Sequence, residues 1–184
     1  MSRDLNKLSK EIYEANKAKG FHEEKHSPEH MLCLVISELM EAVEADRKGR
    51  RADMVKYNEY IRLKKEQNEK LTDKQFRGAF SSTIKDTVED ELADSVIRLL
   101  DTAGALGVNA NSFNTNLSVF GTSFTEKIYD IVSGITMNKA NISIPYGIGR
   151  IEKLCSSLNI DLWQHVDLKL KYNSLRPYKH GKQY

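Results

Sequence analysis

Cysteine, proline and tryptophan are scarce in this chain of 184 residues, which contains two, three and one of them respectively. With no Cys-x-x-Cys pair and only two distant cysteines, the sequence offers neither a disulfide framework nor a zinc-binding pattern. We expect Cys33 and Cys155 to be reduced residues of the core, because both lie in apolar helical patterns. The scarcity of proline and of strand-like alternation favours an all-α fold.

An excess of one charge and long apolar runs are also missing. The 28 Lys and Arg residues against 26 Asp and Glu give a formal net charge of +2, so we expect no nucleic-acid partner. No apolar stretch approaches the ~18 residues that a membrane span needs. The first residues do not begin an apolar signal segment. We therefore expect no membrane partner and a cytoplasmic location.

Several segments have the apolar periodicity of amphipathic helices. The clearest begins at Ser27 as N-cap, with Pro28 in the first helical position, and ends at Gly49. Its apolar residues recur at three- and four-residue steps, which is typical of a helix with one buried face. The helices expected besides this one are residues 3–19, residues 83–106 and residues 161–175, the last with Asp161 as N-cap.

The remaining segments are less regular. Charges of both signs crowd residues 50–80, where we expect a solvated helix followed by a loop. Pro145 and two glycines predict an extended or turned segment at residues 142–149. The other expectations are a loop at residues 108–122 and short helices at residues 124–135 and residues 151–158.

Two pairs of acidic residues are the most informative pattern. Glu38 and Glu41 are three residues apart in one predicted helix, and Glu91 and Asp94 are three apart in another. Residues at this spacing are neighbours on a helix surface. Each pair lies on the same flank of its helix's apolar stripe, so the four carboxylates converge along one edge if the two stripes pack together.

Such a cluster favours a divalent cation. Four carboxylates would repel one another unless a cation neutralised them, and an oxygen-only ligand set suits Mg²⁺ or Mn²⁺. The alternative is that these acids belong to a solvated helix face, since Glu-x-x-Glu is common on surface helices.

A basic face is predicted near the end of the chain. Lys169, Asn173 and Arg176 share one side of the last helix, because they are four and then three residues apart. Two cations and an amide suit a polyphosphate. The alternative is a solvated basic helix end, which the helix dipole favours.

Three histidines recur every four residues, at His22, His26 and His30. Helical histidines at this spacing bind metals in some proteins. Ser27 and Pro28 start a helix between them, so we do not expect the three to share a helix face.

These motifs, taken in order, resemble the MazG-like nucleotide pyrophosphohydrolases of the all-α NTP pyrophosphatase superfamily. The resemblance covers about half of the chain: Glu-x-x-Glu, then Glu-x-x-Asp, then Lys-x-x-x-Asn-x-x-Arg. It lies in residues 19–21, 34–45 and 47–49 for the first signature, residues 91–101 for the second and residues 169–178 for the closing helix.

The resemblance implies a single domain over residues 1–184, an all-α helical bundle with helical insertions at residues 50–80 and 110–160. It implies hydrolysis of a nucleoside triphosphate to the monophosphate and pyrophosphate, with Mg²⁺ as cofactor, Mn²⁺ as a possible substitute, and a role in cleaning the nucleotide pool. A homodimer or homotetramer is expected. The site residues would be Glu38, Glu41, Glu91 and Asp94 for the metal, Glu38 or Glu41 for the general base, and Lys169, Asn173 and Arg176 for the substrate.

Two other functions stay open. Phosphoribosyl-ATP pyrophosphatase has similar acidic motifs, although the segments at 19–21 and 176–178 fit it less well. A non-catalytic helical interaction module using the basic residues 47–77 belongs to a different class. The sequence also departs from the family pattern, since 49 residues separate Glu41 from Glu91. That departure bears on substrate choice and oligomer packing more than on the metal ligands.

Overall fold

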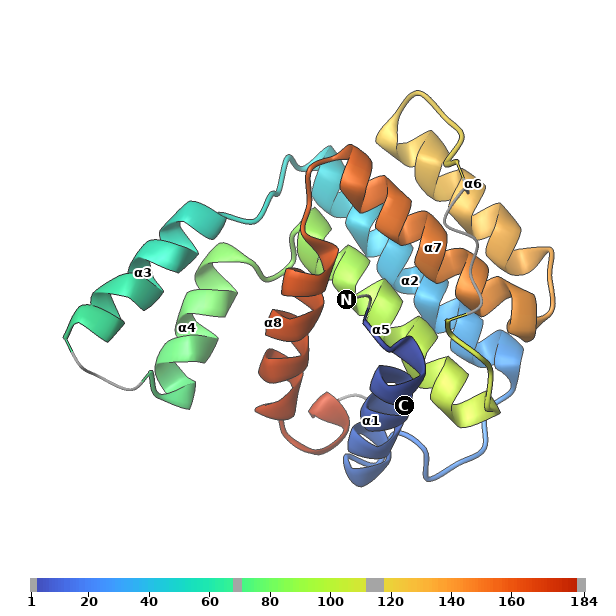
Figure 1. Cartoon of the computed structure of the whole chain (residues 1–184), viewed down its shortest axis with the longest axis horizontal. Helices are drawn as coiled ribbons and strands as arrows, with labels where there is room; N and C mark the ends of the chain where they lie inside the picture. Colours follow the sequence, from blue (N-terminus) through green and yellow to red (C-terminus); the bar gives the residue numbers. More distant parts are fainter. Residues whose placement is uncertain (1–2, 68–70, 112–117, 182–184) are drawn as a thin grey trace.

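The computed structural model describes residues 3–67, 71–111 and 118–181, and this part of the chain is all-α, with no β-strand (Figure 1). The predicted fold class is therefore confirmed. The helices are α1 (Leu5–Ala18), α2 (Pro28–Arg47), α3 (Met54–Glu66), α4 (Asp73–Thr83), α5 (Val88–Leu106), α6 (Phe124–Thr136), α7 (Ala140–Ser157) and α8 (Leu162–Ser174), followed by the short 3-10 helix η1 (Tyr178–Gly181).

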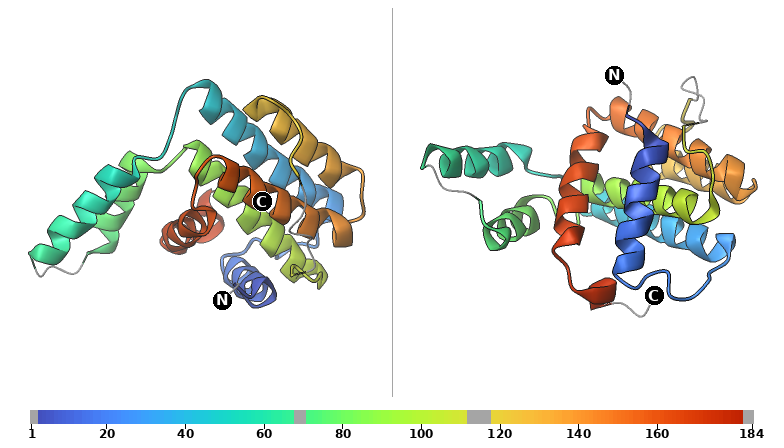
Figure 2. Two further views of the ribbon diagram at one scale, coloured as in Figure 1. Left: turned by 45° about the horizontal axis from the view of Figure 1, so that its top comes forward. Right: turned by 60° about the horizontal axis from the view of Figure 1, so that its bottom comes forward.

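Helix α5 is the centre of the bundle. It contacts α1, α2, α7 and α8, while α6 packs against α2 and α7 (Figure 2). Because neighbours surround it, α5 is buried on nearly every side, and its acidic residues near the N-terminal end are buried with it. The main core also contains isoleucines from α6 and α7, so residues 110–160 contribute to the centre of the molecule.

The capping residues explain where the helices begin and end. The Ser27 side chain accepts a hydrogen bond from the backbone of His30, and Asp161 does the same for Gln164, which confirms both predicted N-caps. Gly107 ends α5 in the left-handed conformation, with φ of 67°. Local sequence signals therefore mark the starts of α2 and α8 and the end of α5, and α2 and α5 carry the predicted metal ligands.

The predicted loop within residues 50–80 is wrong, because residues 73–83 form α4. Thr72 and Gln75 make a reciprocal capping box at its start, a sequence signal that the many charges around it concealed. The predicted helix at 83–106 correspondingly begins later, at Val88. Helices α3 and α4 pair and project from the body, and we call these two helices the arm (Figure 1).

The arm has its own apolar cluster, centred on Phe76 and Phe80 of α4 and Tyr172 of α8. The rings of Phe80 and Tyr172 stack with centroids 4.5 Å apart. This stack attaches the arm to α8, and through α8 to the body.

The predicted extended segment at residues 142–149 is also wrong, because α7 runs through it with Pro145 inside. Proline removes one backbone donor from a helix, but Ile144 and Ile148 are fully buried in the main core. Gly147 allows α7 to lie close against Leu99, because a Cβ there would meet that side chain. Tertiary packing therefore outweighs the local preference of proline and glycine.

The two cysteines differ in burial. Both are unpaired, and Cys155 lies in the core as expected, but Cys33 is exposed, so its predicted burial is wrong. The buried face of α2 includes Met31, Val35 and Leu39 and leaves Cys33 on the outside. Within the described residues, no helix combines the length and apolar character that crossing a membrane requires.

The segment after α8 is bound to the segment after α1. Lys19 donates from its ammonium group to the backbone oxygens of Ser174 and Arg176, at 2.9 and 2.6 Å. The backbone of Lys179 donates to the oxygen of Lys19. Gly20, with φ of +86°, lies against the ring of Tyr178, where a Cβ would clash. We call these contacts the clasp.

Candidate functional site

Three predicted acidic residues come together between α2 and α5. Glu38, Glu91 and Asp94 each place a carboxylate oxygen within 4.8 Å of the other two. This follows from the three-residue spacing on α5 and from the packing of α2 against α5. The predicted pairing of the two helices is confirmed, and we call these three residues the acidic triad.

The triad is more deeply buried than the sequence indicates. Glu38 and Glu91 are each 4% exposed, because neighbouring helices cover this side of both helices, which does not fit the alternative of a solvated helix face. Burial raises the pKa of Glu91 to about 8. Burial, together with the charge of Asp94, also raises the pKa of Glu38 above its ordinary value. Both carboxylates therefore lack the solvation that a surface acid has.

Glu41, the fourth predicted acid, lies apart from the triad. It is exposed on α2, one turn beyond Glu38, and does not belong to the close group of carboxylates. Its charge still acts on Glu38 and raises the pKa of that residue further. The structure therefore brings together three of the four predicted ligands and leaves Glu41 at the solvent side.

Lys169 is placed differently from the expectation for a substrate ligand. Its ammonium group pairs with Asp90 at 2.8 Å and with Asp94 at 2.9 Å, and the residue is 5% exposed. Burial opposes the charge, but the carboxylates of Asp94 and Asp90 outweigh it and raise the pKa of Lys169. Lys169 therefore balances buried carboxylates and does not present a cation to solvent.

Asp90 is a member of this charge cluster that was not predicted from the sequence. This residue is 1% exposed, and its Oδ2 atom accepts hydrogen bonds from Lys169 and from the backbone of Asp86. Its Oδ1 atom is buried without a hydrogen-bond partner. The available signal was the four-residue spacing of Asp90 and Asp94, which puts both on the side of α5 that meets α8.

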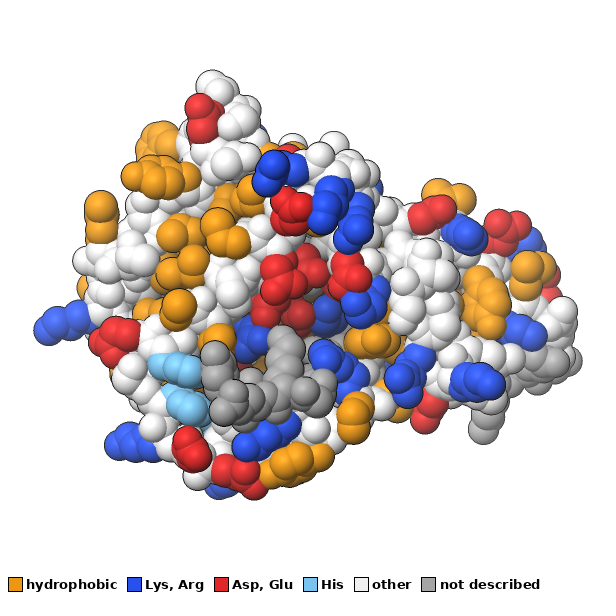
Figure 3. All heavy atoms as spheres, turned by 180° about the vertical axis from the view of Figure 1, so that it is seen from behind, with side chains coloured by type: hydrophobic (Ala, Val, Ile, Leu, Met, Phe, Trp, Pro, Cys, Tyr) orange, Lys and Arg blue, Asp and Glu red, His pale blue; other side chains and the backbone are white. Residues whose placement is uncertain are grey.

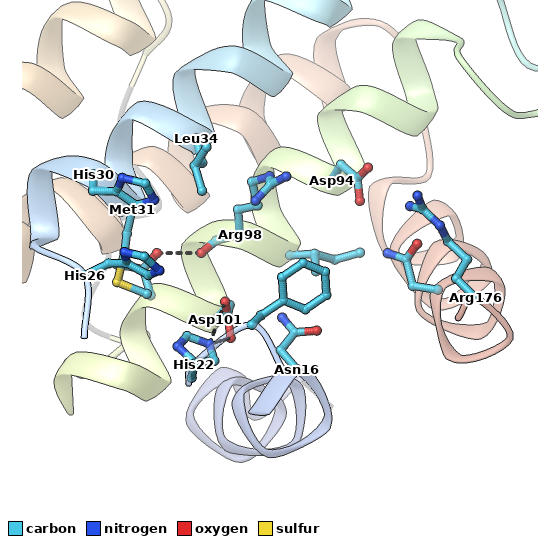
Figure 4. A pocket seen from close by; sticks show the side chains of 14 residues that line it. Asn16, His22, His26, His30, Met31, Leu34, Asp94, Arg98, Asp101 and Arg176 are labelled. Carbon is cyan, nitrogen blue, oxygen red and sulfur yellow. Dashed lines mark hydrogen bonds and ion pairs between the residues drawn. The ribbon is translucent and has the colours of Figure 1, made fainter. Parts of the chain in front are cut away.

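A pocket adjoins the triad and shares Asp94 with it. Its walls come from the end of α1, the segment before α2, α2 itself, α5 and the end of α8 (Figure 4). Asn173 and Arg176 line it, as expected for substrate ligands, and the Oδ1 atom of Asn173 is buried without a hydrogen-bond partner. A ligand with a suitable donor would satisfy that atom.

The three histidines line the same pocket although they do not share a helix. The Nε2 atom of His22 lies 2.9 Å from Asp101, and the rings of His26 and His30 stack with centroids 4.3 Å apart. Among the described residues, the close groups of possible metal ligands contain carboxylates only. The histidines therefore form a wall of the pocket, and the carboxylates form the candidate cation site.

Arg98 joins the pocket to the triad. Its Nε atom donates to Oε1 of Glu38 at 2.5 Å, and its side chain lines the pocket. In the view of Figure 4, Arg98 lies between Asp94 on one side and His26 and His30 on the other. This position of Arg98 was not predicted from the sequence.

The chemistry of these groups fits a divalent cation. The triad offers oxygen ligands only, which suits Mg²⁺ or Mn²⁺. With Asp90, four carboxylates face the two cations Lys169 and Arg98, which leaves two formal negative charges when all are ionised. Figure 3 shows acidic side chains gathered at the centre of one face, with basic side chains around them.

A second group of acids fits less well. Asp86, Asp90 and Glu91 also bring carboxylate oxygens within 4.8 Å of one another. Asp86 is paired with Lys85 at 2.5 Å, and Asp90 is paired with Lys169. Lysines therefore already balance two of these three carboxylates.

Comparisons of the chain with protein-family models, with curated proteins and with solved structures found no match.

Proposed function

We propose that this protein is a Mg²⁺-dependent nucleoside triphosphate pyrophosphohydrolase. It would convert an NTP or dNTP and water to the nucleoside monophosphate and pyrophosphate. The observation that carries the proposal is the junction of the acidic triad with a pocket lined by Asn173 and Arg176, with Asp94 common to both. The resemblance of the motifs to the MazG-like family supports the same activity.

The residues that line the pocket suggest how a nucleoside triphosphate would be oriented in it. Glu38, Glu91 and Asp94 would hold Mg²⁺, which neutralises phosphate charge and lowers the pKa of bound water. The triphosphate would lie at this end, where Arg176 supplies a positive charge to the pocket wall. The nucleoside would occupy the end lined by Phe21 and the histidines, which offers aromatic surface and hydrogen-bonding atoms.

The reaction requires a base near the triad. Water would attack the α-phosphorus, the bond from that phosphorus to the bridging oxygen would break, and pyrophosphate would leave with the bond's electrons. Glu38 and Glu41 are the candidates for accepting the water's proton. Glu38 belongs to the triad but pairs with Arg98, whereas Glu41 is exposed one turn away along α2.

The biological setting is part of the proposal. The role would be removal of unwanted nucleotides, in the cytoplasm, by a homodimer or homotetramer. Tyr129 and Met137 of the α6 region and Ile142 of α7 are large apolar residues with more than half of their surface exposed. These residues are candidates for the subunit interface, because association would remove their apolar surface from water.

The test is pyrophosphate release from a panel of NTPs, dNTPs and phosphoribosyl-ATP with Mg²⁺, with EDTA as the metal-free condition. Glu91→Gln keeps the shape of a triad ligand but removes its charge, so turnover should fall by roughly 100-fold or more, because the cation supplies several kcal/mol to the transition state. The matched control is Glu59→Gln, which changes an exposed acid on α3 and should leave turnover unchanged.

The outcomes separate the alternatives. Release from ordinary triphosphates that stops in EDTA and in Glu91→Gln supports the proposal. Release from phosphoribosyl-ATP alone identifies the related pyrophosphatase. Equal turnover in EDTA rejects the metal assignment, and no release from any substrate favours a helical interaction module.

A further inference from the structure

Arg98 belongs to a polar stripe that runs along α5 from the triad into the pocket. Glu91, Asp94, Arg98 and Asp101 follow one another at intervals of three, four and three residues, so they lie along one side of the helix. Asp94, Arg98 and Asp101 line the pocket, and Asp94 belongs to the triad as well. Arg98 is the cation within this stripe.

The surroundings of Arg98 differ from those of Lys169. The Lys169 ammonium is held by two carboxylates on the buried side of the triad. Arg98 is held by Glu38 at 2.5 Å, and its side chain is 29% exposed whereas that of Glu38 is 5% exposed. The guanidinium therefore lies at the boundary between the buried carboxylates and the open pocket.

This position sets up a competition for Glu38. Arg98 donates a hydrogen bond to a carboxylate oxygen of Glu38. Glu38 is also one of the three residues that would bind the metal ion. A guanidinium and a divalent cation that share one carboxylate repel each other. The pocket gives the Arg98 side chain space to turn away from Glu38. A phosphate group bound in the pocket would offer the guanidinium two acceptor oxygens.

We propose that Arg98 is the resident counter-cation of the acidic triad and changes partner on substrate binding. Without a metal ion it neutralises Glu38, and with a metal ion and a triphosphate bound it releases Glu38 and pairs with the polyphosphate. Arg98 is a positioning residue in the first state and a substrate ligand in the second. This inference rests on the proposed function and assigns a role to a residue outside the acidic signature.

The experiment measures binding by calorimetry, without turnover. The probes are Mn²⁺ alone, and inorganic tripolyphosphate in the presence of saturating Mn²⁺. Arg98→Gln should bind Mn²⁺ roughly tenfold more tightly than the wild type, because one unit charge close to a carboxylate changes its affinity for a cation by about a factor of ten or more. The same variant should bind tripolyphosphate more weakly, also by roughly tenfold, because a charged hydrogen-bond donor is lost.

Two further variants control the result. Arg98→Lys keeps the charge, so its affinity for Mn²⁺ should stay near that of the wild type. Arg47→Gln removes one positive charge from the exposed end of α2, where Arg47 pairs with Glu44, and should change neither affinity. Melting curves of each variant establish that it is folded.

Different experimental results would contradict the proposed function and the role of Arg98. Absence of Mn²⁺ binding in the wild type would overturn both. Wild-type binding of Mn²⁺, with no gain in affinity in Arg98→Gln, would overturn only the role of Arg98 as counter-cation. Unchanged binding of tripolyphosphate in Arg98→Gln would overturn the change of partner.

Discussion

At the scale of single residues, burial decides what each charged side chain can do. Lys169 and Arg98 both lie beside the acidic triad, but Lys169 is enclosed by Asp90 and Asp94 while Arg98 faces the pocket. A buried charge needs its partner, because removing the partner leaves an uncompensated ion in a poorly solvated site. The two cations should therefore respond very differently to mutation.

Replacing Lys169 should damage folding before it damages binding. Lys169→Met should lower the free energy of unfolding by about 3–5 kcal/mol, since it leaves the fully buried carboxylate of Asp90 and the partly buried carboxylate of Asp94 without their cation. Denaturant unfolding measures this change. Adding Asp90→Asn to Lys169→Met should recover part of the loss, while Lys153→Met, an exposed lysine on α7, should cost little. A loss below about 1 kcal/mol, the usual value for an exposed pair, would mean that Lys169 is solvated.

The same distinction explains which residues could be predicted from the sequence. The spacing of Glu91 and Asp94 is a local property of one helix, so their convergence with Glu38 followed once α2 and α5 were paired. The inward placement of Lys169 depends on how α8 packs across α5, which residue spacing does not specify. Asp90 and Arg98 were missed for that reason, since their partners lie on other helices.

At the scale of helices, capping signals were informative and helix breakers were misleading. Ser27 and Asp161 mark the starts of α2 and α8 as predicted. Pro145 indicated a break, but the burial of Ile144 and Ile148 keeps α7 helical through it. Local propensity fails where a segment is held by apolar contacts from several neighbours.

The arm of α3 and α4 should unfold separately from the body. Phe80→Ala removes a fully buried ring that stacks on Tyr172, which should cost about 3–5 kcal/mol within the arm's own cluster. Native-state hydrogen exchange should then show faster exchange in α3 and α4, with the amides of α2 and α5 still protected.

The control for the arm is Val55→Ala, because Val55 is 81% exposed on α3 and its removal should not change exchange. Equal loss of protection in the arm and in α5 of Phe80→Ala would show one cooperative unit instead.

At the scale of the whole molecule, the all-α class was the most predictable property, because it depends on periodicity summed over many residues. Apart from the pairing of α2 with α5, the arrangement around α5 was not predictable, since the long-range contacts that define it leave no local pattern. One consequence of this packing is that His165 makes a pH-dependent contribution to stability. His165 of α8 is 3% exposed, and burial lowers its pKa below the ordinary 6.5.

The contribution of His165 to stability should therefore decrease as the pH falls below about 6.5, the ordinary pKa of histidine, while the raised pKa values of Glu91 and Glu38 act in the opposite direction. The unfolded chain binds a proton at His165 near that pH, whereas the folded chain does so only at a lower pH, so protonation favours unfolding. His165→Leu should remove this contribution. The measurement is the free energy of unfolding of both proteins from pH 7.5 to pH 5, and the difference should change in favour of the variant only below pH 6.5. A constant difference would mean that His165 titrates alike in both states.

The clasp has a consequence for the order in which the molecule assembles. It joins Lys19 to Arg176, which are 157 residues apart in the sequence, and Arg176 lines the pocket. Contacts of such separation have the largest loop-closure entropy cost, so they form after the helix pairs that are close in sequence. The pocket is thus completed late in folding, and a ligand held there slows unfolding without accelerating folding.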